Sequence, residues 1–415
     1  MSRHVLVVGG GAAGTLAALR AAEVGAKVTL LEKNDRLGIK ILISGGGKCN
    51  ITHAGTVNEV LKGFRHDEAR FLRRSMYRFD NHAIMSILEG RGLELMVRED
   101  GRVFPVEGSA KDVVEILRQL LVEAGVEIRY ESPVAEILFE NEEVQGARLQ
   151  SGEEIRADAT VVAVGGSSYP KTGATGDGYP WMKAVGHTVK RIMPALAPIY
   201  LQEAPTWAEE RSGVALRGVL LKAKASKELA RWRGDLLFTH HGVSGPTVLG
   251  VSREVAESLP GDVKLTVDLL PDVSYEDMKD RFVKATQAHP KRTARSLVEG
   301  VVPSRLEVCV VEDAAVDPAT PLSTLTAKDR NRLIETLKGW EVGRVRAVPL
   351  ERGEVVAGGV ALDEVDSITM ASTKAANLFL CGEILDIAGA VGGYNLQAAF
   401  STGYVAGESA GTGSC

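Results

Sequence analysis

The sequence predicts an α/β protein in which a nucleotide-binding domain is interrupted by a long insertion. Near the N-terminus, a short apolar run, His4–Val8, leads directly into a glycine-rich turn and a helical stretch. Near the C-terminus, "NLFLCGEILD" (377–386) again has a buried strand that ends in glycine and acid. Between them the pattern changes to short alternating strands and then to helices. We therefore expect the two ends to fold together around the insertion.

The composition is that of an ordinary globular protein. The chain has 415 residues, 45% hydrophobic and 25% charged, which suits two or three domains. Lys and Arg number 49 against 54 Asp and Glu, so the net charge is -5 and a general nucleic-acid binder is not expected. No apolar run is long enough to span a bilayer, and no signal-peptide pattern precedes the first strand. We expect a soluble cytoplasmic protein with a small-molecule substrate and without a nucleic-acid or membrane partner, whereas the oligomeric state stays unknown.

Cysteine and histidine spacing argues against disulfides and metals. None of the four cysteines forms a CxxC pair, and free thiols suit a reducing cytoplasm. The eight histidines show no HxxxH or HxH spacing and have no adjacent cysteine. The sequence therefore predicts no metal site.

The N-terminal elements predict a dinucleotide site. Gly9, Gly11 and Gly14 have GxGxxG spacing between the first strand and a helix through Val24. The second strand, in "AKVTLLEK", ends at Glu32, where a carboxylate can accept hydrogen bonds from ribose hydroxyls. Glycine-rich turns also arise for packing alone, but strand, glycines, helix, strand and acid occur here in the right order.

The rest of the chain favours FAD over NAD as the dinucleotide. A helix over 109–125 and a strand precede an alternating meander with turns near Asn141 and Gly152. A buried strand, Ala159–Val164, then ends in two further glycines. The late strand ending at residue 386 can bring an acid to the ribitol chain, and the helix after it can face the flavin's pyrimidine ring. A simple NAD dehydrogenase would not need this return of the C-terminus.

Motifs along nearly the whole chain resemble one family. In order they are "VVGGGAAG", "LEKN", "ISGGGKCNIT", "GGSSYPKTGATGDGY", "LLFTHHGVSGPTVL", "GGVALDEV" and "GEILDIAGAVGGYNLQAAFSTG". This combination resembles the BaiN/RdsA family of NAD(P)/FAD-dependent oxidoreductases. The resemblance implies an FAD-binding two-dinucleotide (Rossmann-like) domain with an inserted β-rich barrel-like domain and a small helical domain. It also implies reduction of conjugated double bonds in steroid-like enones, or oxidation of amines.

The insertion is expected in two parts. Residues 1–190 and 355–415 form the predicted FAD-binding domain, 191–272 and 338–354 the β-rich insert, and 273–337 the helical part. Within the insert, short strands and one short helix after Pro246 are expected. In the helical part, 274–289, 292–302 and 327–340 are predicted helices, the first with a cap at Ser274.

The residues assigned to the FAD site are those of the glycine turns, the strand ends and the last helix start. They are Gly9, Gly11, Ala12, Ala13, Gly14, Glu32, Lys33, Lys40, Ser44, Gly45, Gly46, Gly47, Cys49, Asn50, Val134, Gly165, Gly166, Gly382, Glu383, Asp386, Gly393, Asn395 and Leu396. Tyr394 and Gln397 are expected to shape the cofactor end of the pocket.

Four residues are candidates for catalysis: Tyr169, Lys171, His241 and Cys49. Tyr169 and Lys171 could donate a proton to a substrate carbonyl, or their loop could merely pack on the flavin edge. His240 and His241 follow a buried strand and are expected on opposite faces, so at most one can meet the flavin. Cys49 beside three glycines is either a small packing residue or a redox or substrate contact.

The predicted function is that of an FAD-dependent oxidoreductase that passes hydride from NAD(P)H to an electron-poor substrate. Because no second GxGxxG follows a strand, NAD(P)H would dock transiently. A basic segment could bind its phosphate or could be a solvated hairpin, and its members are Arg217, Lys222, Lys224, Lys227, Arg231 and Arg233. The alternatives are an oxidase that uses oxygen and an RNA-associated flavoprotein.

Overall fold

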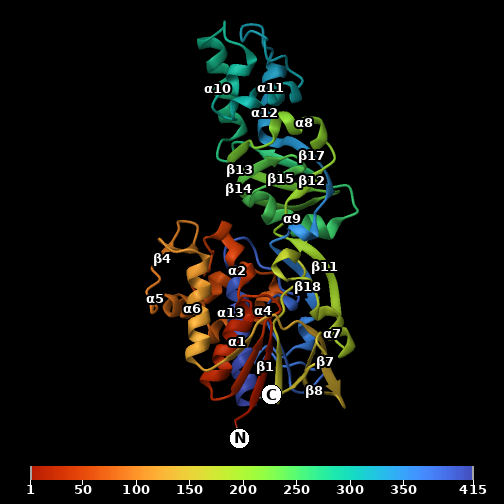
Figure 1. The fold of residues 1–415 in the computed structure, drawn as a ribbon. Helices are drawn as coiled ribbons and strands as arrows, with labels where there is room; N and C mark the ends of the chain where they lie inside the picture. Colours follow the sequence, from red (N-terminus) through yellow and green to blue (C-terminus); the bar gives the residue numbers. More distant parts are fainter. Residues whose placement is uncertain (1, 414–415) are drawn as a thin grey trace. The chain divides into compact units, whose positions relative to one another are not determined.

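A computed structural model describes residues 2–413, which form two compact units (Figure 1). Unit 1 comprises the chain up to Met193 and from Glu354 onward, and unit 2 comprises Pro194–Gly353. The sequence places the corresponding boundaries near 190 and 355. The predicted helical part, 273–337, lies in the same compact unit as the strands of the insert.

Unit 1 is built on a parallel sheet of five strands in the order β19-β10-β1-β2-β6. Its strands are β1 (His4–Val8), β2 (Lys27–Leu31), β6 (Glu127–Arg129), β10 (Ala159–Val162) and β19 (Leu378–Leu380). The predicted strands are thus confirmed, and the late strand pairs with β10, beside the first strand. In a parallel sheet the loops that follow the strands gather at one edge, so both glycine-rich turns lie there.

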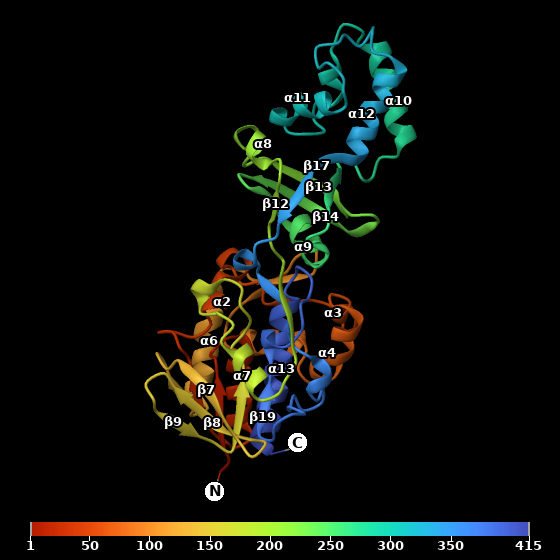
Figure 2. The same cartoon turned by 90° about the vertical axis from the view of Figure 1, so that its right-hand side faces the viewer.

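Helices cover one face of this sheet and a smaller sheet covers the other (Figures 1 and 2). The covering helices are α1 (Ala12–Glu23), α6 (Ala110–Glu123) and α13 (Tyr394–Thr412). The opposite face carries α7 (Gly178–Ala184) and an antiparallel meander of β7 (Val134–Glu140), β8 (Glu143–Leu149) and β9 (Glu154–Arg156). Asn141 and Gly152 turn with positive φ, as the sequence predicts.

Shorter elements complete unit 1. They are α2 (Ile39–Ile43), η1 (Ser44–Gly47), α3 (Val57–Leu61), α4 (His66–Arg78), α5 (Asn81–Glu89), η2 (Pro170–Thr172), η5 (Leu362–Glu364) and η6 (Gly382–Ile384) among the helices, and β3 (Thr52–His53), β4 (Leu95–Val97), β5 (Arg102–Pro105), β11 (Val189–Ala195) and β18 (Val355–Val360) among the strands. β11 and β18 pair with each other, at the two points where the chain leaves and re-enters unit 1.

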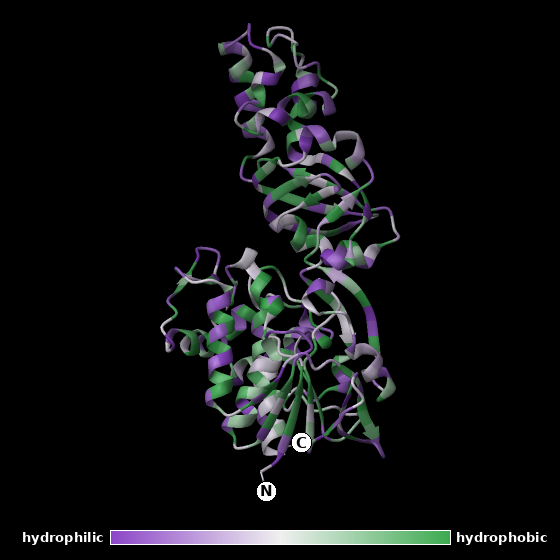
Figure 3. Ribbon diagram, viewed as in Figure 1, coloured by the Kyte–Doolittle hydropathy of each residue, from purple (hydrophilic) through white to green (hydrophobic). Residues whose placement is uncertain are grey.

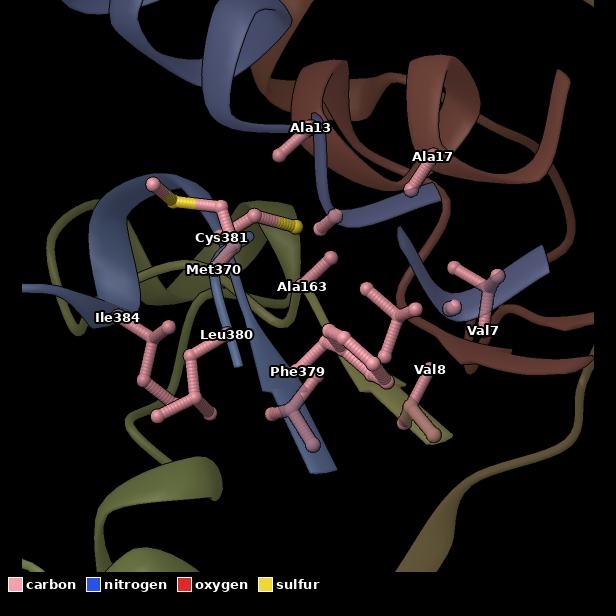
Figure 4. Close-up of a cluster of buried hydrophobic side chains, with 14 of the residues drawn as sticks. Val7, Val8, Ala13, Ala17, Ala163, Met370, Phe379, Leu380, Cys381 and Ile384 are labelled. Carbon is pink, nitrogen blue, oxygen red and sulfur yellow. The ribbon is translucent and has the colours of Figure 1, made fainter. Parts of the chain in front are cut away.

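Small residues let α1 and α13 pack closely. A Cβ on Gly403 would lie 2.1 Å from the carbonyl oxygen of Ala13, and one on Gly407 would lie 2.1 Å from that of Ala17. The close approach brings α13 over the apolar layer of the sheet, where Val7 and Phe379 are fully buried (Figure 4). The C-terminal helix therefore belongs to the core of unit 1.

Unit 2 contains a closed six-stranded barrel, as the resemblance implies. Its strands are β12 (Ile199–Leu201), β13 (Ala215–Lys224), β14 (Glu228–Thr239), β15 (Gly242–Ser244), β16 (Lys264–Asp268) and β17 (Trp340–Ala347). Hydrophobic and hydrophilic residues alternate along them (Figure 3), because one side of each strand faces the barrel core. The helix after Pro246, α9 (Pro246–Ser258), is longer than predicted.

Three helices and a short 3-10 turn form the helical part of unit 2, together with α8 (Ala204–Arg211) beside the barrel. The helices α10 (Tyr275–Ala288) and α12 (Ala327–Gly339) confirm two predictions, and Ser274 caps the first. The predicted helix over 292–302 is wrong, because only Ala294–Leu297 turns, as a 3-10 helix. Its backbone bonds instead to the 318–322 segment, and Gly300 takes a positive φ. α11 (Ser304–Asp313) follows and was not predicted.

A buried histidine ties α7 to the loop before β19 and makes the stability of unit 1 depend on pH. His187 contacts Glu364 Oε2 through Nδ1 at 3.3 Å and Ser372 Oγ through Nε2 at 2.8 Å. Burial lowers the pKa of His187, although the Glu364 carboxylate opposes this shift. The folded protein therefore holds a neutral imidazole where the unfolded chain binds a proton, below a pKa of about 6.5.

We expect the free energy of unfolding to fall as the pH drops below about 6.5, by up to about 1.4 kcal/mol per pH unit from this residue. His187→Gln should reduce that slope, because the unfolded variant no longer takes up this proton. Urea unfolding of both proteins across this pH range measures it. Equal slopes for the two proteins would show that His187 is not the titrating group.

Candidate functional site

Glycine is present at each of the three positions of the first turn for a different structural reason. Gly9 has a φ of +103°, and a Cβ there would lie 2.6 Å from the carbonyl oxygen of Ala163. A Cβ on Gly14 would lie 1.8 Å from the carbonyl oxygen of Gly9, so helix and strand pack tightly there. A Cβ on Gly11 would meet no atom within 4 Å. The first and third glycines are needed by the fold, whereas the second leaves open space at the helix start.

The start of α1 offers unpaired hydrogen-bond donors to that space. Gly11 is the N-cap, and no side chain caps the helix. Among residues 2–413, the backbone N–H groups of residues 11–14 have no acceptor. Free N–H groups and the positive end of the helix dipole favour a bound anion. These donors and the open space at Gly11 fit the pyrophosphate of a dinucleotide.

Glu32 follows β2 and is buried beside the same turn, with 7% exposure. Its Oε2 accepts from the backbone N–H of Gly10 at 2.9 Å. Its Oε1 accepts from the backbone N–H of Asn34 at 2.9 Å and from the Asn34 side-chain amide at 2.6 Å. A carboxylate has further lone pairs, so Glu32 can hold the turn and still accept from ribose hydroxyls.

The loop after β10 is tied to the end of β2. Lys33 Nζ donates to Thr175 Oγ1 at 2.7 Å and pairs with Asp177 Oδ2 at 2.6 Å. A Cβ on Gly173 would lie 2.7 Å from Nδ2 of Asn34. The predicted site residue Lys33 thus positions the loop that carries Tyr169 and Lys171.

A second polar network joins three segments of the sheet edge. Lys40, on α2, donates from Nζ to Glu383 Oε2 at 2.6 Å and to Ser168 Oγ at 2.7 Å. Glu383, on η6 after β19, also accepts from the backbone N–H of Val356 at 2.9 Å. A Cβ on Gly166 would lie 3.2 Å from Glu383 Oε1, so this glycine lies against the carboxylate. The structure therefore brings the predicted residues Lys40, Gly166 and Glu383 together.

The three-glycine loop adopts a conformation that favours glycine. Gly45, Gly46 and Gly47 have φ of +57°, +69° and +87°. Such values place the backbone in the left-handed region, which costs other residues about 1 kcal/mol each. Beside Gly46 a Cβ would meet nothing within 4 Å, so the loop is open on that side. Ser44 is bound inward, since its Oγ donates to Ile41 O at 2.7 Å.

Cys49 is fully buried beneath this loop. Burial raises the pKa of its thiol to about 11, against a weaker opposing effect of the hydrogen bond with Ser44. The nucleophilic thiolate is therefore scarcely populated at neutral pH. This environment favours the packing role of Cys49 over the catalytic role that the sequence left open.

Cys49→Ser is expected to retain at least half of the wild-type turnover, because no thiolate is used. The wild-type protein is treated with N-ethylmaleimide and its peptides are mapped. Cys49 should be unmodified after treatment of the native protein and modified after treatment in urea. Loss of turnover in the variant together with rapid native labelling would mean that the thiol is reactive.

The C-terminal part of the site rests on glycines and amides. Gly382, with a φ of +74°, donates its N–H to Thr402 Oγ1 at 3.0 Å. Gly393 N donates to the side-chain oxygen of Asn50 at 3.0 Å when that amide is oriented to satisfy both groups. Asn395 closes the preceding loop through two hydrogen bonds with Gly389, at 2.8 and 3.0 Å. These contacts fix the backbone at the start of α13.

Two predicted pocket residues have other partners. Asp386 pairs with Lys190 Nζ at 2.9 Å and accepts from the backbone N–H of Gly358 at 3.0 Å, so it anchors β18. Gln397 is buried and bonds to Thr52, Phe79 and Ser401, so its prediction as a pocket residue is wrong. In the sequence, the only sign of this packing role is that Gln397 stands four residues before Ser401 on the same helix, a spacing at which the two side chains can bond.

The remaining assigned residues lie as follows. Val134 is the buried first residue of β7, Leu396 is partly buried in the first turn of α13, and Gly165 has a φ of +74° after β10. Tyr394 is half-buried and stacks on His53 with ring centroids 4.6 Å apart. Tyr169 has a φ of +49° and is 36% exposed, whereas Lys171 is exposed on η2.

His241 lies in unit 2, in the turn that directly precedes β15. His240 and His241 form the two-residue turn between β14 and β15, and both are exposed, so their predicted placement on opposite strand faces is wrong. The ring centroid of His241 lies 5.3 Å from that of Tyr200.

In the basic segment, Arg217, Arg231 and Arg233 pair with Asp235, Glu228 and Asp272. β13 pairs on both sides, so the segment is not a free edge hairpin.

Sequence reasoning missed Ser168 and Asn34 as members of the site. Both stand inside motifs that it quoted, "GGSSYPK" and "LEKN", but polar residues after a strand have many roles.

Two negative findings concern residues 2–413 as a whole. No helix there is both long and apolar enough to cross a bilayer. No group of three His, Cys, Asp or Glu side chains there is arranged to hold a metal ion.

Comparison with known proteins gives a family match over almost the full chain. The sequence model of the HI0933-like protein Rossmann domain matches residues 3–409. Two similar proteins of known activity are each 30% identical to the chain. One is the 3-dehydro-bile acid delta(4,6)-reductase of Clostridium scindens, aligned over 97% of this chain and 98% of the relative. The other is the ribosomal RNA dihydrouridine synthase of Haemophilus influenzae, aligned over 96% of both.

Solved structures share the fold at low sequence identity. A 3-ketosteroid delta1-dehydrogenase from Sterolibacterium denitrificans superposes with a TM-score of 0.52 at 13% identity, covering 99% of this chain and 100% of the other. The quinol fumarate reductase of E. coli gives 0.52 at 16% identity, covering 99% and 70%. The expectation that no nucleic acid is involved gains no support here, because one relative acts on ribosomal RNA.

Proposed function

The chain belongs to the HI0933-like Rossmann-domain family, and on that premise we propose that this FAD-dependent oxidoreductase reduces a carbon–carbon double bond conjugated to a carbonyl group. The observation that carries the proposal is that relatives with different substrates are equally similar to the chain, each at 30% identity over its length. What their named reactions share is therefore a better guide to this chain than either substrate alone.

The shared feature is an electron-poor double bond. A 3-dehydro bile acid with double bonds at positions 4 and 6 is a conjugated dienone. Uridine differs from dihydrouridine by two hydrogens, across a ring double bond that is conjugated to a carbonyl. In both, the carbonyl withdraws electrons, so the far carbon of the double bond accepts a hydride and the near carbon then takes a proton. When bound and reduced by NAD(P)H, the flavin would supply the hydride.

We assign the binding of FAD to residues of unit 1. The free N–H groups of residues 11–14 would hold the pyrophosphate, and Glu32 would accept from the adenosine ribose. The Gly45–Gly47 loop and the Lys40–Glu383 pair would lie along the cofactor, as their place at the same sheet edge suggests. Lys33 and Asn395 support this set by fixing the neighbouring loops.

The proton for the near carbon needs a donor on the protein. Tyr169 and Lys171 are candidates, since they stand on a loop that Lys33 ties to the cofactor edge. Tyr169 holds a left-handed conformation, and such conformations cluster at functional sites. If Tyr169 donates, Tyr169→Phe should slow turnover without changing the FAD content.

The hydride source is proposed to be NAD(P)H. The test is to mix the FAD-loaded protein anaerobically with NADH or NADPH and follow the visible absorbance of the flavin. Bleaching by either nucleotide supports the reductase. If neither bleaches the flavin while an amine does, and oxygen then restores the absorbance, the oxidase alternative replaces it.

A further inference from the structure

One face of α4 presents arginine and tyrosine to solvent. Arg70, Arg73, Arg74 and Tyr77 stand at i, i+3, i+4 and i+7, and all four are exposed. This spacing places them on a single helix face, with neighbours along it about 5.4 Å apart. The opposite face, which includes Phe71, Leu72 and Met76, is buried in unit 1, where α4 packs beside α13 (Figure 2). We call these four residues, with Arg78, the α4 basic face.

Neighbouring residues hold this face in position. The Asn58 side-chain oxygen, on α3, accepts from Arg73 Nη1 at 3.1 Å and from the Tyr77 hydroxyl at 3.3 Å. Arg78 bonds to both carboxylate oxygens of Glu408, at 2.9 and 2.8 Å. The tyrosine ring nevertheless stays 58% exposed. A large aromatic ring fixed at one end and open to solvent is suited to stacking.

The carboxylates near this face do not balance its charge. Arg70 has Asp67 at 3.7 Å, and Arg78 shares Glu408 with Arg20. Among residues 2–413, no carboxylate pairs with Arg73 or Arg74. In a chain with a net charge of -5, this concentration of positive charge on one helix predicts an anionic partner.

We propose that the α4 basic face binds folded RNA, with its arginines on successive phosphates and Tyr77 against an unpaired base. Planar guanidinium groups bond phosphate oxygens in pairs, and aromatic rings stack with bases of any sequence. The proposal rests on the proposed function, because uracil in RNA contains a double bond conjugated to a carbonyl and is one substrate of that reaction type.

The test compares two variants of equal charge by fluorescence anisotropy with a labelled RNA hairpin that carries uridines in its loop. The test variant is Arg70→Gln/Arg73→Gln/Arg74→Gln. The matched control is Lys27→Gln/Lys111→Gln/Lys183→Gln, three exposed lysines that are scattered over unit 1. Full-length, FAD-loaded proteins are used, and their FAD content and thermal unfolding are measured first.

We expect the arginine variant to bind roughly a hundredfold more weakly at about 0.1 M salt, with a salt slope smaller by about 2, since three phosphate contacts are lost. The control should bind like the wild type. Tyr77→Leu should weaken binding about tenfold without changing the salt slope. Tyr77→Phe keeps the aromatic ring and should bind RNA as tightly as the wild type.

Three outcomes would overturn the proposal: no binding of the hairpin by the wild type at low salt, equal weakening in the control variant, or equally tight binding of a DNA hairpin of the same sequence. Reduction of a small conjugated enone by the same proteins separates the two proposals. If that activity is present and RNA binding is absent, only the RNA surface is wrong.

Discussion

Gly11→Val is expected to give a folded protein that retains no FAD. A Cβ at Gly11 would meet no atom within 4 Å, and the φ of -82° and ψ of -168° there are values that valine adopts readily. The apoprotein should therefore unfold at nearly the wild-type temperature. The new side chain instead fills the space in front of the free N–H groups of residues 11–14, so the pyrophosphate cannot reach them.

Two other glycine variants make this result specific. Gly14→Ala places a Cβ 1.8 Å from the carbonyl oxygen of Gly9 and should disturb folding itself. Gly339→Val, also in open space but at the end of α12, should keep both the fold and the FAD. The FAD-to-protein absorbance ratio after purification, with thermal unfolding of the apoproteins, distinguishes the three. A yellow, fully loaded Gly11→Val protein would refute this placement of the pyrophosphate.

Lys40→Met is expected to weaken both the fold and the hold on FAD. It removes the cation from Glu383 and the donor from Ser168, whose side chain is fully buried. Glu383 then keeps a largely buried charge, 16% exposed, with only the Val356 N–H and a distant hydroxyl as donors. Since Lys40 is itself 30% exposed, we expect a loss of about 1–2 kcal/mol in the free energy of unfolding.

The loss of FAD affinity follows from the three segments that Lys40 joins. Without the lysine, α2 is no longer tied to η6, and the loop after β10 keeps only the 3.5 Å contact of Ser168 with Glu383. The cofactor must then order these segments on binding, and we expect about tenfold weaker binding. Isothermal titration of the apoproteins with FAD measures this. Lys40→Met/Glu383→Gln should recover part of the stability, because the unpaired charge is gone. A double mutant no better than the single one would show that the ion pair is not the cause.

The sequence predicted the nucleotide-binding half of the fold well because its signals are local. Strand, glycine spacing and terminal acid are set by neighbours along the chain. Gly9 and Gly14 have the packing roles that this pattern assigns, and Glu32 lies beside the same turn. The predicted helix over 292–302 failed because pairing with a distant segment replaced its own backbone bonds. Gln397 was misread for the same reason, since its partners Thr52 and Phe79 are far away in the chain.

The polar network of Lys40, Ser168 and Glu383 and the α4 basic face could not be predicted from the sequence for a related reason. Lys40 and Glu383 are separated by 343 positions, and nothing in their local pattern couples them. The arginines of α4 occur in a chain with net negative charge, so their concentration on one face is visible only once the helix is placed. Which side chains share an edge or a face is a property of the packed structure.

The central claim, reduction of a double bond conjugated to a carbonyl, is tested most directly by the oxidative half-reaction. The FAD-loaded protein is photoreduced without oxygen and mixed with a 3-keto-4-ene steroid, or with the saturated ketone of the same skeleton as a control. We predict that the enone alone restores the flavin absorbance and yields a product heavier by two hydrogens. Flavin that stays reduced with every conjugated carbonyl compound tried, uridine in RNA included, and is reoxidised only by oxygen would contradict the account.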